Sequence, residues 1–108
     1  MTWRVETLNE TVERELDALP ADMQARFART GRLIATFGLE RVGAPHVRHL
    51  AGPLWEIRLS GRDGIARALY VVATGRRVVV VRAFVKKTRS TPRREIELAL
   101  RRAREVMQ

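Results

Sequence analysis

Residues 54–85 read LWEIRLSGRDGIARALYVVATGRRVVVVRAFV, three largely apolar runs separated by two glycine-containing turns. The first run, Leu54–Ser60, alternates apolar and polar residues, which indicates a strand with one buried face. The second, Ile65–Ala73, is mostly apolar, and the third, Val78–Val85, is interrupted only by Arg82. A run of that kind is typical of a central strand covered on both faces. Because GRDG and TGR suit tight hairpin turns, the stretch predicts an antiparallel meander.

Helical patterns lie on either side of this meander. Thr7 and Glu10 have the spacing of a capping box, and apolar residues then recur at helical spacing up to Pro20, which ends one helix and begins another. The second helix is expected to end at Gly38. Two consecutive helices with so short a link predict a helical hairpin. Helical spacing returns over Glu95–Met107.

Two more segments complete the expected order. Trp3–Glu6 alternates apolar and polar residues, which indicates a short strand. Residues 39–53, LERVGAPHVRHLAGP, contain two Gly and two Pro and predict a loop. The order is therefore β-α-α-β-β-β-α, with an N-terminal strand and a helical hairpin packed on a small antiparallel sheet. This order belongs to the α+β class, and a length of 108 residues predicts one domain over residues 1–108.

The positive charge is concentrated in the second part of the chain. The 21 Lys and Arg exceed the 12 Asp and Glu by a net charge of +9. Residues 1–40 hold five Arg and seven acids, whereas residues 41–108 hold sixteen Lys and Arg and five acids. Such a balance favours a polyanionic partner, either nucleic acid or an acidic protein tail. Nearly all the cations are arginine, which binds phosphate through a planar fork, although a GC-rich genome produces the same preference without a functional cause.

Composition excludes several classes of protein. The absence of cysteine excludes disulfide frameworks, thiolate zinc sites and cysteine nucleophiles. The longest apolar run, Ala68–Ala73, is six residues, far short of the ~20 that a membrane span needs. The N-terminal residues lack an apolar signal segment, so the sequence predicts a cytoplasmic protein. His46 and His49 have too few acidic neighbours to complete a metal shell, so neither a metal nor another cofactor is expected.

Three motifs carry a family resemblance. They are LWEIRL at 54–59, an Arg-x-Leu-Tyr at 67–70 and FVKKTRSTP at 84–92, which leads into the last helix. Together with the element order they resemble the RelE/ParE toxin superfamily, and within it the phage-derived HigB-like branch of type II toxin–antitoxin systems. The resemblance covers essentially the whole chain and implies a RelE-like fold.

The resemblance also implies an activity and partners. It implies a toxin that acts as a metal-independent endoribonuclease (an mRNA interferase), cleaving mRNA on the ribosome and so inhibiting translation. The implied partners are the ribosome, mRNA and a cognate antitoxin, usually a helix-turn-helix protein, with no membrane involved. Part of the sheet edge, or the groove beside the last helix, is expected to receive the antitoxin. Because ParE-like members of this superfamily poison DNA gyrase on the same fold, a gyrase poison is one alternative. A non-catalytic nucleic-acid-binding module is another.

Four residues are candidates for the catalytic site. Arg58 and Arg67 lie on adjacent predicted strands, where they could converge on one phosphate. They resemble family positions that carry basic catalytic or phosphate-binding residues, so we expect them to stabilise transition-state charge; the alternative is a solvated sheet face. Glu56 shares a strand face with Arg58, and a neighbouring guanidinium would keep it ionised as a base. Arg82 is expected either to pair, with Glu56 as a candidate partner, or to point into the site.

A basic segment follows the last predicted strand. Lys86, Lys87 and Arg89 are expected to hold the RNA backbone or ribosomal RNA through phosphate contacts, which fix position without reading sequence. The alternative is a solvated, charged turn before the last helix.

The sequence offers several candidates for the group that transfers the proton and does not single one out. Some family members use a histidine or tyrosine near the C-terminal end, and this chain has neither after Tyr70. The candidates are Glu56, Tyr70, His46 and His49. Because this histidine or tyrosine is missing, we expect catalysis to depend on positioning and electrostatics more than on an acid–base pair.

Overall fold

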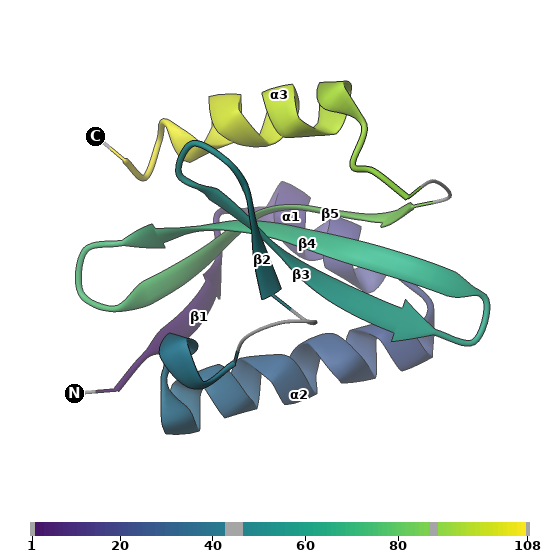
Figure 1. The fold of residues 1–108 in the computed structure, drawn as a ribbon, viewed down its shortest axis with the longest axis horizontal. Coiled ribbons are helices and arrows are strands. Elements are labelled where there is room, and N and C mark those ends of the chain that lie inside the picture. Colours follow the sequence, from purple (N-terminus) through teal and green to yellow (C-terminus); the bar gives the residue numbers. More distant parts are fainter. Residues whose placement is uncertain (1, 43–46, 87–88, 108) are drawn as a thin grey trace.

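The computed structural model describes residues 2–42, 47–86 and 89–107. Its elements are β1 (Arg4–Thr7), α1 (Glu10–Asp17), α2 (Ala21–Phe37), a short 3-10 helix η1 (Leu39–Arg41), β2 (Val47–Ala51), β3 (Leu54–Gly61), β4 (Gly64–Ala73), β5 (Arg77–Lys86) and α3 (Arg93–Ala103). The strands form one sheet in the order β1-β5-β4-β3-β2. Figure 1 shows α3 on one side of the sheet and α2 on the other. The α+β class predicted from the sequence is confirmed.

The predicted meander is present as β3, β4 and β5. These three strands pair in antiparallel fashion, and the turn residue Gly75 adopts a φ of 89°, a conformation that glycine adopts without steric cost. The register places Arg58 directly opposite Arg67 and Glu56 opposite Leu69. Alternation along β3 thus puts both predicted site residues of this strand on one face of the sheet.

The sheet is larger than the sequence predicted. The segment interpreted as a loop contains β2, which pairs with β3 in antiparallel fashion. Gly52 and Pro53, which favoured a loop, instead connect β2 to β3, and Gly52 has a φ of 53°. At the opposite edge β1 pairs with β5 in parallel. The sheet is therefore mixed: β2, β3, β4 and β5 are antiparallel neighbours, whereas β1 adds a parallel edge to the small antiparallel sheet that was expected.

The helix boundaries also differ from the predicted ones. Thr7 does not cap α1, because it is the last residue of β1 and pairs with Val80. Asn9 caps the helix instead: its side chain accepts a hydrogen bond from the backbone N–H of Val12 at 3.1 Å, as N-cap residues do. The last helix, α3, begins at Arg93, directly after Pro92, and ends at Ala103.

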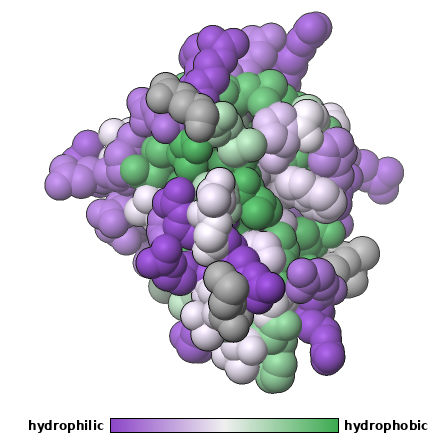
Figure 2. Space-filling model, turned by 90° about the vertical axis from the view of Figure 1, so that its left-hand side faces the viewer, coloured by the Kyte–Doolittle hydropathy of each residue, from purple (hydrophilic) through white to green (hydrophobic). Residues whose placement is uncertain are grey.

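Two apolar cores lie on the two faces of the sheet. On one face, residues of α1 and α2 such as Val12, Met23 and Ile34 pack against β3, β4 and β5. On the other face, Ala99 and Ala103 of α3 pack against the same three strands. Seen from the side (Figure 2), apolar residues form a band through the middle of the molecule with hydrophilic residues around it. Within the described residues, no helix has both the length and the apolar character needed to cross a membrane.

Tyr70 lies in the first of these cores. Its side chain is fully buried, and its hydroxyl has no hydrogen-bond partner among the described residues. Burial raises the pKa of the phenol from 10.0 to about 12. Since the folded protein holds this proton more tightly than the unfolded chain does, the stability that Tyr70 contributes is present below pH 10 and decreases as the pH rises towards 12.

We predict that Tyr70→Phe leaves the free energy of unfolding at pH ~7 unchanged or raises it by about 1 kcal/mol, since it removes an unpaired buried hydroxyl. Between pH ~10 and ~12 the variant should lose less stability than the parent. Urea unfolding at pH ~7 and ~11 measures both effects. A variant several kcal/mol less stable at pH ~7, or one with the same alkaline loss as the parent, contradicts the prediction.

Candidate active site

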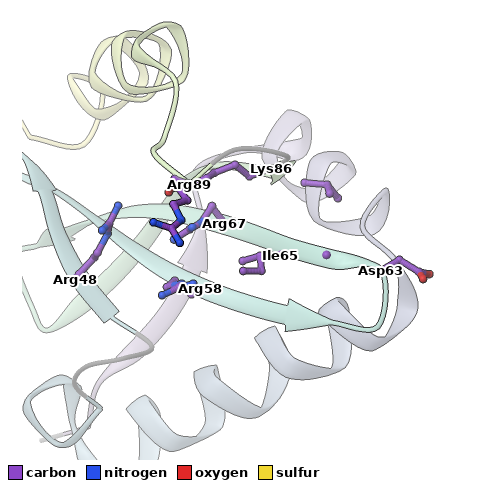
Figure 3. A pocket seen from close by; sticks show the side chains of 9 residues that line it. Arg48, Arg58, Asp63, Ile65, Arg67, Lys86 and Arg89 are labelled. Atoms are coloured by element: carbon purple, nitrogen blue, oxygen red, sulfur yellow. The ribbon is translucent and has the colours of Figure 1, made fainter.

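An open pocket of about 860 Å³ lies on the sheet beyond the N-terminal end of α3. Its lining is dominated by cations and includes one carboxylate: Arg48, Arg58, Asp63, Gly64, Ile65, Arg67, Val85, Lys86 and Arg89. Figure 3 shows Arg58, Arg67 and Arg89 gathered towards one end of this pocket, with Asp63 at the other end. Four segments therefore supply positive charge to one concave surface: β2, β3, β4 and the end of β5 with the residues after it.

Strand pairing brings the two principal candidates together. Arg58 and Arg67 are direct cross-strand partners, a position in which like charges repel. Arg67 is only 3% exposed, and its guanidinium donates to Glu56 Oε1 at 2.6 Å. Arg58 is half-buried, and no carboxylate of the described residues pairs with it. The Nε atoms of both arginines are buried and have no acceptor within the described part of the chain.

Glu56 lies fully buried beside the pocket and connects three segments. Its Oε1 accepts from Arg67 of β4 at 2.6 Å and from Arg48 of β2 at 3.0 Å. Its Oε2 accepts from the hydroxyl of Thr91, which precedes α3, at 2.5 Å. The guanidiniums beside this carboxylate thus come from the neighbouring strands and not from Arg58 on its own strand, and both carboxylate oxygens already have partners.

Lys86 closes the pocket on the β5 side. Its side chain is 7% exposed, and its ammonium donates to the backbone carbonyl of Arg89. Burial lowers the pKa of Lys86, and the positive charges of Arg67, Arg48 and Arg58 lower it further while Glu56 opposes them. Burial is also the main cause that lowers the pKa of Arg67. The pocket therefore concentrates more positive charge than its own carboxylates balance, which suits an anionic ligand.

Arg82 lies outside this pocket, and the expected pair with Glu56 does not form. Strand register places the buried side chain of Leu69 between them, because Leu69 is the partner of both residues. Arg82 instead binds Glu95 of α3 through Nε at 2.8 Å and Nη2 at 3.1 Å, and Glu15 of α1 at 3.0 Å. These carboxylates raise the pKa of its guanidinium. Arg82 therefore connects α1 and α3 to the sheet.

The described candidates for proton transfer other than Glu56 lie outside the pocket. Tyr70 is on the opposite face of the sheet, in the core beneath α1 and α2. His49 of β2 is hydrogen-bonded through Nε2 to the carbonyl of Gly52 at 2.8 Å, with its ring against Trp55, and it does not line the pocket. Lys87 and His46 lie outside the described residues. Among the residues that the structure describes, no group of three or more His, Cys, Asp or Glu is placed to hold a metal ion.

Sequence reasoning missed two residues of the site, Arg48 and Thr91. Arg48 lies in the segment predicted to be a loop, and in the structure it is an exposed residue of β2 directly after the buried Val47. Thr91 lies in the basic segment before the last helix. Its hydrogen bond to Glu56 spans 35 residues in the chain, so no local pattern could reveal it.

Comparison with known proteins identifies the family. Residues 14–104 match the family of phage-derived Gp49-like proteins, DUF891, whereas no curated protein matches the chain. The free-state structure of the Escherichia coli toxin RelE, with two arginines changed to alanine, has a TM-score of 0.66 and 16% identity, covering 94% of this chain and 98% of that one. A chain of the RelE–RelB complex of Pyrococcus horikoshii has a TM-score of 0.57 and 23% identity, covering 82% and 100%. These matches confirm the RelE-like fold, and the family match spans most of the chain, from α1 through α3; the protein belongs to the phage-derived Gp49-like family, built on the fold of RelE.

Proposed function

We propose that this protein is the toxin of a type II toxin–antitoxin system and that it cleaves mRNA on the ribosome. The observation that carries the proposal is the pair of facing arginines, Arg58 and Arg67, whose buried Nε atoms have no acceptor among the described residues at an open, cationic pocket. The family and the fold support it, since one structural relative is named as a toxin.

Arg58 and Arg67 stabilise the transition state in this proposal. When the 2′-hydroxyl of RNA attacks the adjacent phosphate, negative charge increases on the non-bridging oxygens. Two guanidiniums held side by side provide N–H donors where that charge develops. Because Arg67 is almost completely buried and bound to Glu56, its donors keep their orientation without a large loss of side-chain entropy on binding.

Glu56 acts as a positioning residue and not as the base. Each of its oxygens is already hydrogen-bonded, so abstracting a proton would require it to release Arg67, Arg48 or Thr91. The pocket's own cations supply the charge that a metal provides in other nucleases, so we propose a metal-independent reaction. Arg82 supports the reaction only indirectly, by holding α3 on the sheet.

The remaining cations bind the RNA backbone. Lys86, Arg89 and Arg48 face the same pocket as the arginine pair, and phosphate contacts of this kind set the register of an RNA strand without reading its bases. We assign the same task to Lys87, the next residue of the basic segment. The pocket is open, and most of its charged side chains are arginines that do not exchange protons. Such a pocket suits a substrate that is positioned by a larger particle, here the ribosome.

An antitoxin is the second partner that we propose. One structural relative is a RelE–RelB complex, and the net charge of +9 favours an acidic surface on whatever binds this chain. We propose that this antitoxin is a helix-turn-helix protein and that the toxin acts in the cytoplasm, where messages are translated.

The first test is a translation reaction with purified protein, in which the 5′ ends of the message are mapped. We predict cleavage only when ribosomes are present, and a loss of about 10²–10³-fold in rate for Arg58→Ala and Arg67→Lys, since each removes donors to the transition-state charge. Arg32→Ala, an exposed arginine of α2, is the matched control and should cleave like the parent.

Two results would contradict this proposal. One is an intact message at a dose of protein that stops growth; DNA damage at that dose would indicate a gyrase poison. The other is unchanged cleavage by both Arg58→Ala and Arg67→Lys in protein that is folded by circular dichroism, which would remove the arginine pair from the site.

A second prediction concerns Glu56→Gln. Neutralising this carboxylate leaves the buried Arg67 guanidinium without a counter-charge, so the free energy of unfolding should fall by on the order of 3 kcal/mol. The control is Glu97→Gln, an exposed carboxylate paired with Arg93 at 3.4 Å on α3, where a change below about 1 kcal/mol is expected. Urea unfolding compares the two; equal small effects would show that Glu56 does not organise the site.

A further inference from the structure

Most cations of the pocket cannot exchange a proton. Among the described residues that line it, four of the five cations are arginines, whose guanidiniums stay protonated in proteins. Lys86 is the fifth, and an ammonium can give up a proton and regain it. Within the described part of the lining, the only other ionisable side chain is Asp63, which is exposed on the turn between β3 and β4 at the far end of the pocket.

Lys86 lies next to the arginine pair on the same face of the sheet. Strand pairing sets Phe84 opposite Arg67 and Lys86 opposite Ile65, so Lys86 is one same-face position along β5 from the row that holds Arg67 and Arg58. Two residues along a strand span about 7 Å, a distance that a lysine side chain can bridge. A phosphate between Arg58 and Arg67 would therefore have the Lys86 ammonium at its side.

The surroundings of Lys86 favour release of its proton. Arg67 of β4, Arg58 of β3 and Arg48 of β2 line the same pocket as Lys86, and these three and Glu56 of β3 act on its ammonium electrostatically. Glu56 is the single negative group among these described neighbours, and it is already bound by Arg67, Arg48 and Thr91. The side chain is more than nine-tenths buried, and one of its three N–H donors is held by the Arg89 carbonyl. Burial and the neighbouring cations lower the pKa of this ammonium, which makes it a stronger acid towards an alkoxide.

We propose that Lys86 is the general acid of the cleavage and gives the Nζ proton to the 5′-oxygen as that oxygen leaves phosphorus. This inference rests on the proposed function. In the step, a bond forms between the 2′-oxygen and phosphorus, and the bond from phosphorus to the 5′-oxygen breaks. The 5′-oxygen keeps the electron pair and takes the Lys86 proton. The 2′ proton passes to a solvent water, and the neutral amine regains a proton from solvent. The products are a 2′,3′-cyclic phosphate and a 5′-hydroxyl.

A substrate with a different leaving atom tests this assignment. The probe is a message in which sulfur replaces the bridging 5′-oxygen at the mapped cleavage site, because a thiolate leaves without needing a proton. Lys86→Arg keeps the charge and a donor for the Arg89 carbonyl, but a guanidinium does not act as an acid. We expect Lys86→Arg to cut the ordinary message at least about 10²-fold more slowly than the parent, and to cut the sulfur-containing message at nearly the parental rate.

Arg67→Lys is the control that separates the two kinds of defect. It weakens donors to the non-bridging oxygens, so it should remain slow on both messages. Lys86→Arg that is equally slow on both messages, or that cuts the ordinary message as fast as the parent, overturns the assignment while leaving the proposed function intact. If the parent cuts neither message with ribosomes present, the proposed function fails and the assignment of Lys86 fails with it.

Discussion

The buried carboxylate of Glu56 is the constraint on which the arrangement of the pocket depends. Two arginines, Arg58 and Arg67, face each other across neighbouring strands, and Arg67 is almost completely buried. Such a pair is unfavourable unless a counter-charge lies beside it. Glu56 supplies that charge to Arg67. Its carboxylate oxygens also accept hydrogen bonds from Arg48 of β2 and from Thr91, which precedes α3. One side chain thereby connects the edge strand, the centre of the sheet and the start of the last helix.

The rest of the same sheet face is organised by a second group of charges. Arg82 of β5 and Arg102 of α3 both bind Glu15 of α1, and Arg82 also binds Glu95. The helix α3 buries Ala99 and Ala103 and packs the half-buried Ile96 and Leu100 against the sheet, and these ion pairs add to that packing in locating the helix. Because α3 covers only part of the face, the remainder stays open and carries the pocket.

Much of the fold could be predicted from local patterns. Alternation in Leu54–Ser60 indicated a strand with one buried face, and the apolar run at Val78–Val85 indicated a strand covered on both faces. The hairpin turns then placed Arg58 and Arg67 on adjacent strands, as the structure has them. The edge strand β2 was missed, because Gly and Pro mark both loops and hairpin turns.

What the sequence by itself determined was the identity of four of the five strands, the α+β class and the concentration of positive charge after residue 40. Only the tertiary structure decided which charges meet. Glu56 pairs with Arg67 and Arg48 and not with Arg82, because Leu69 occupies the position between Glu56 and Arg82. The bond from Thr91 to Glu56 joins residues 35 positions apart. Periodicity reports which face a residue occupies, whereas ion pairs depend on strand order and register, which are properties of the folded chain.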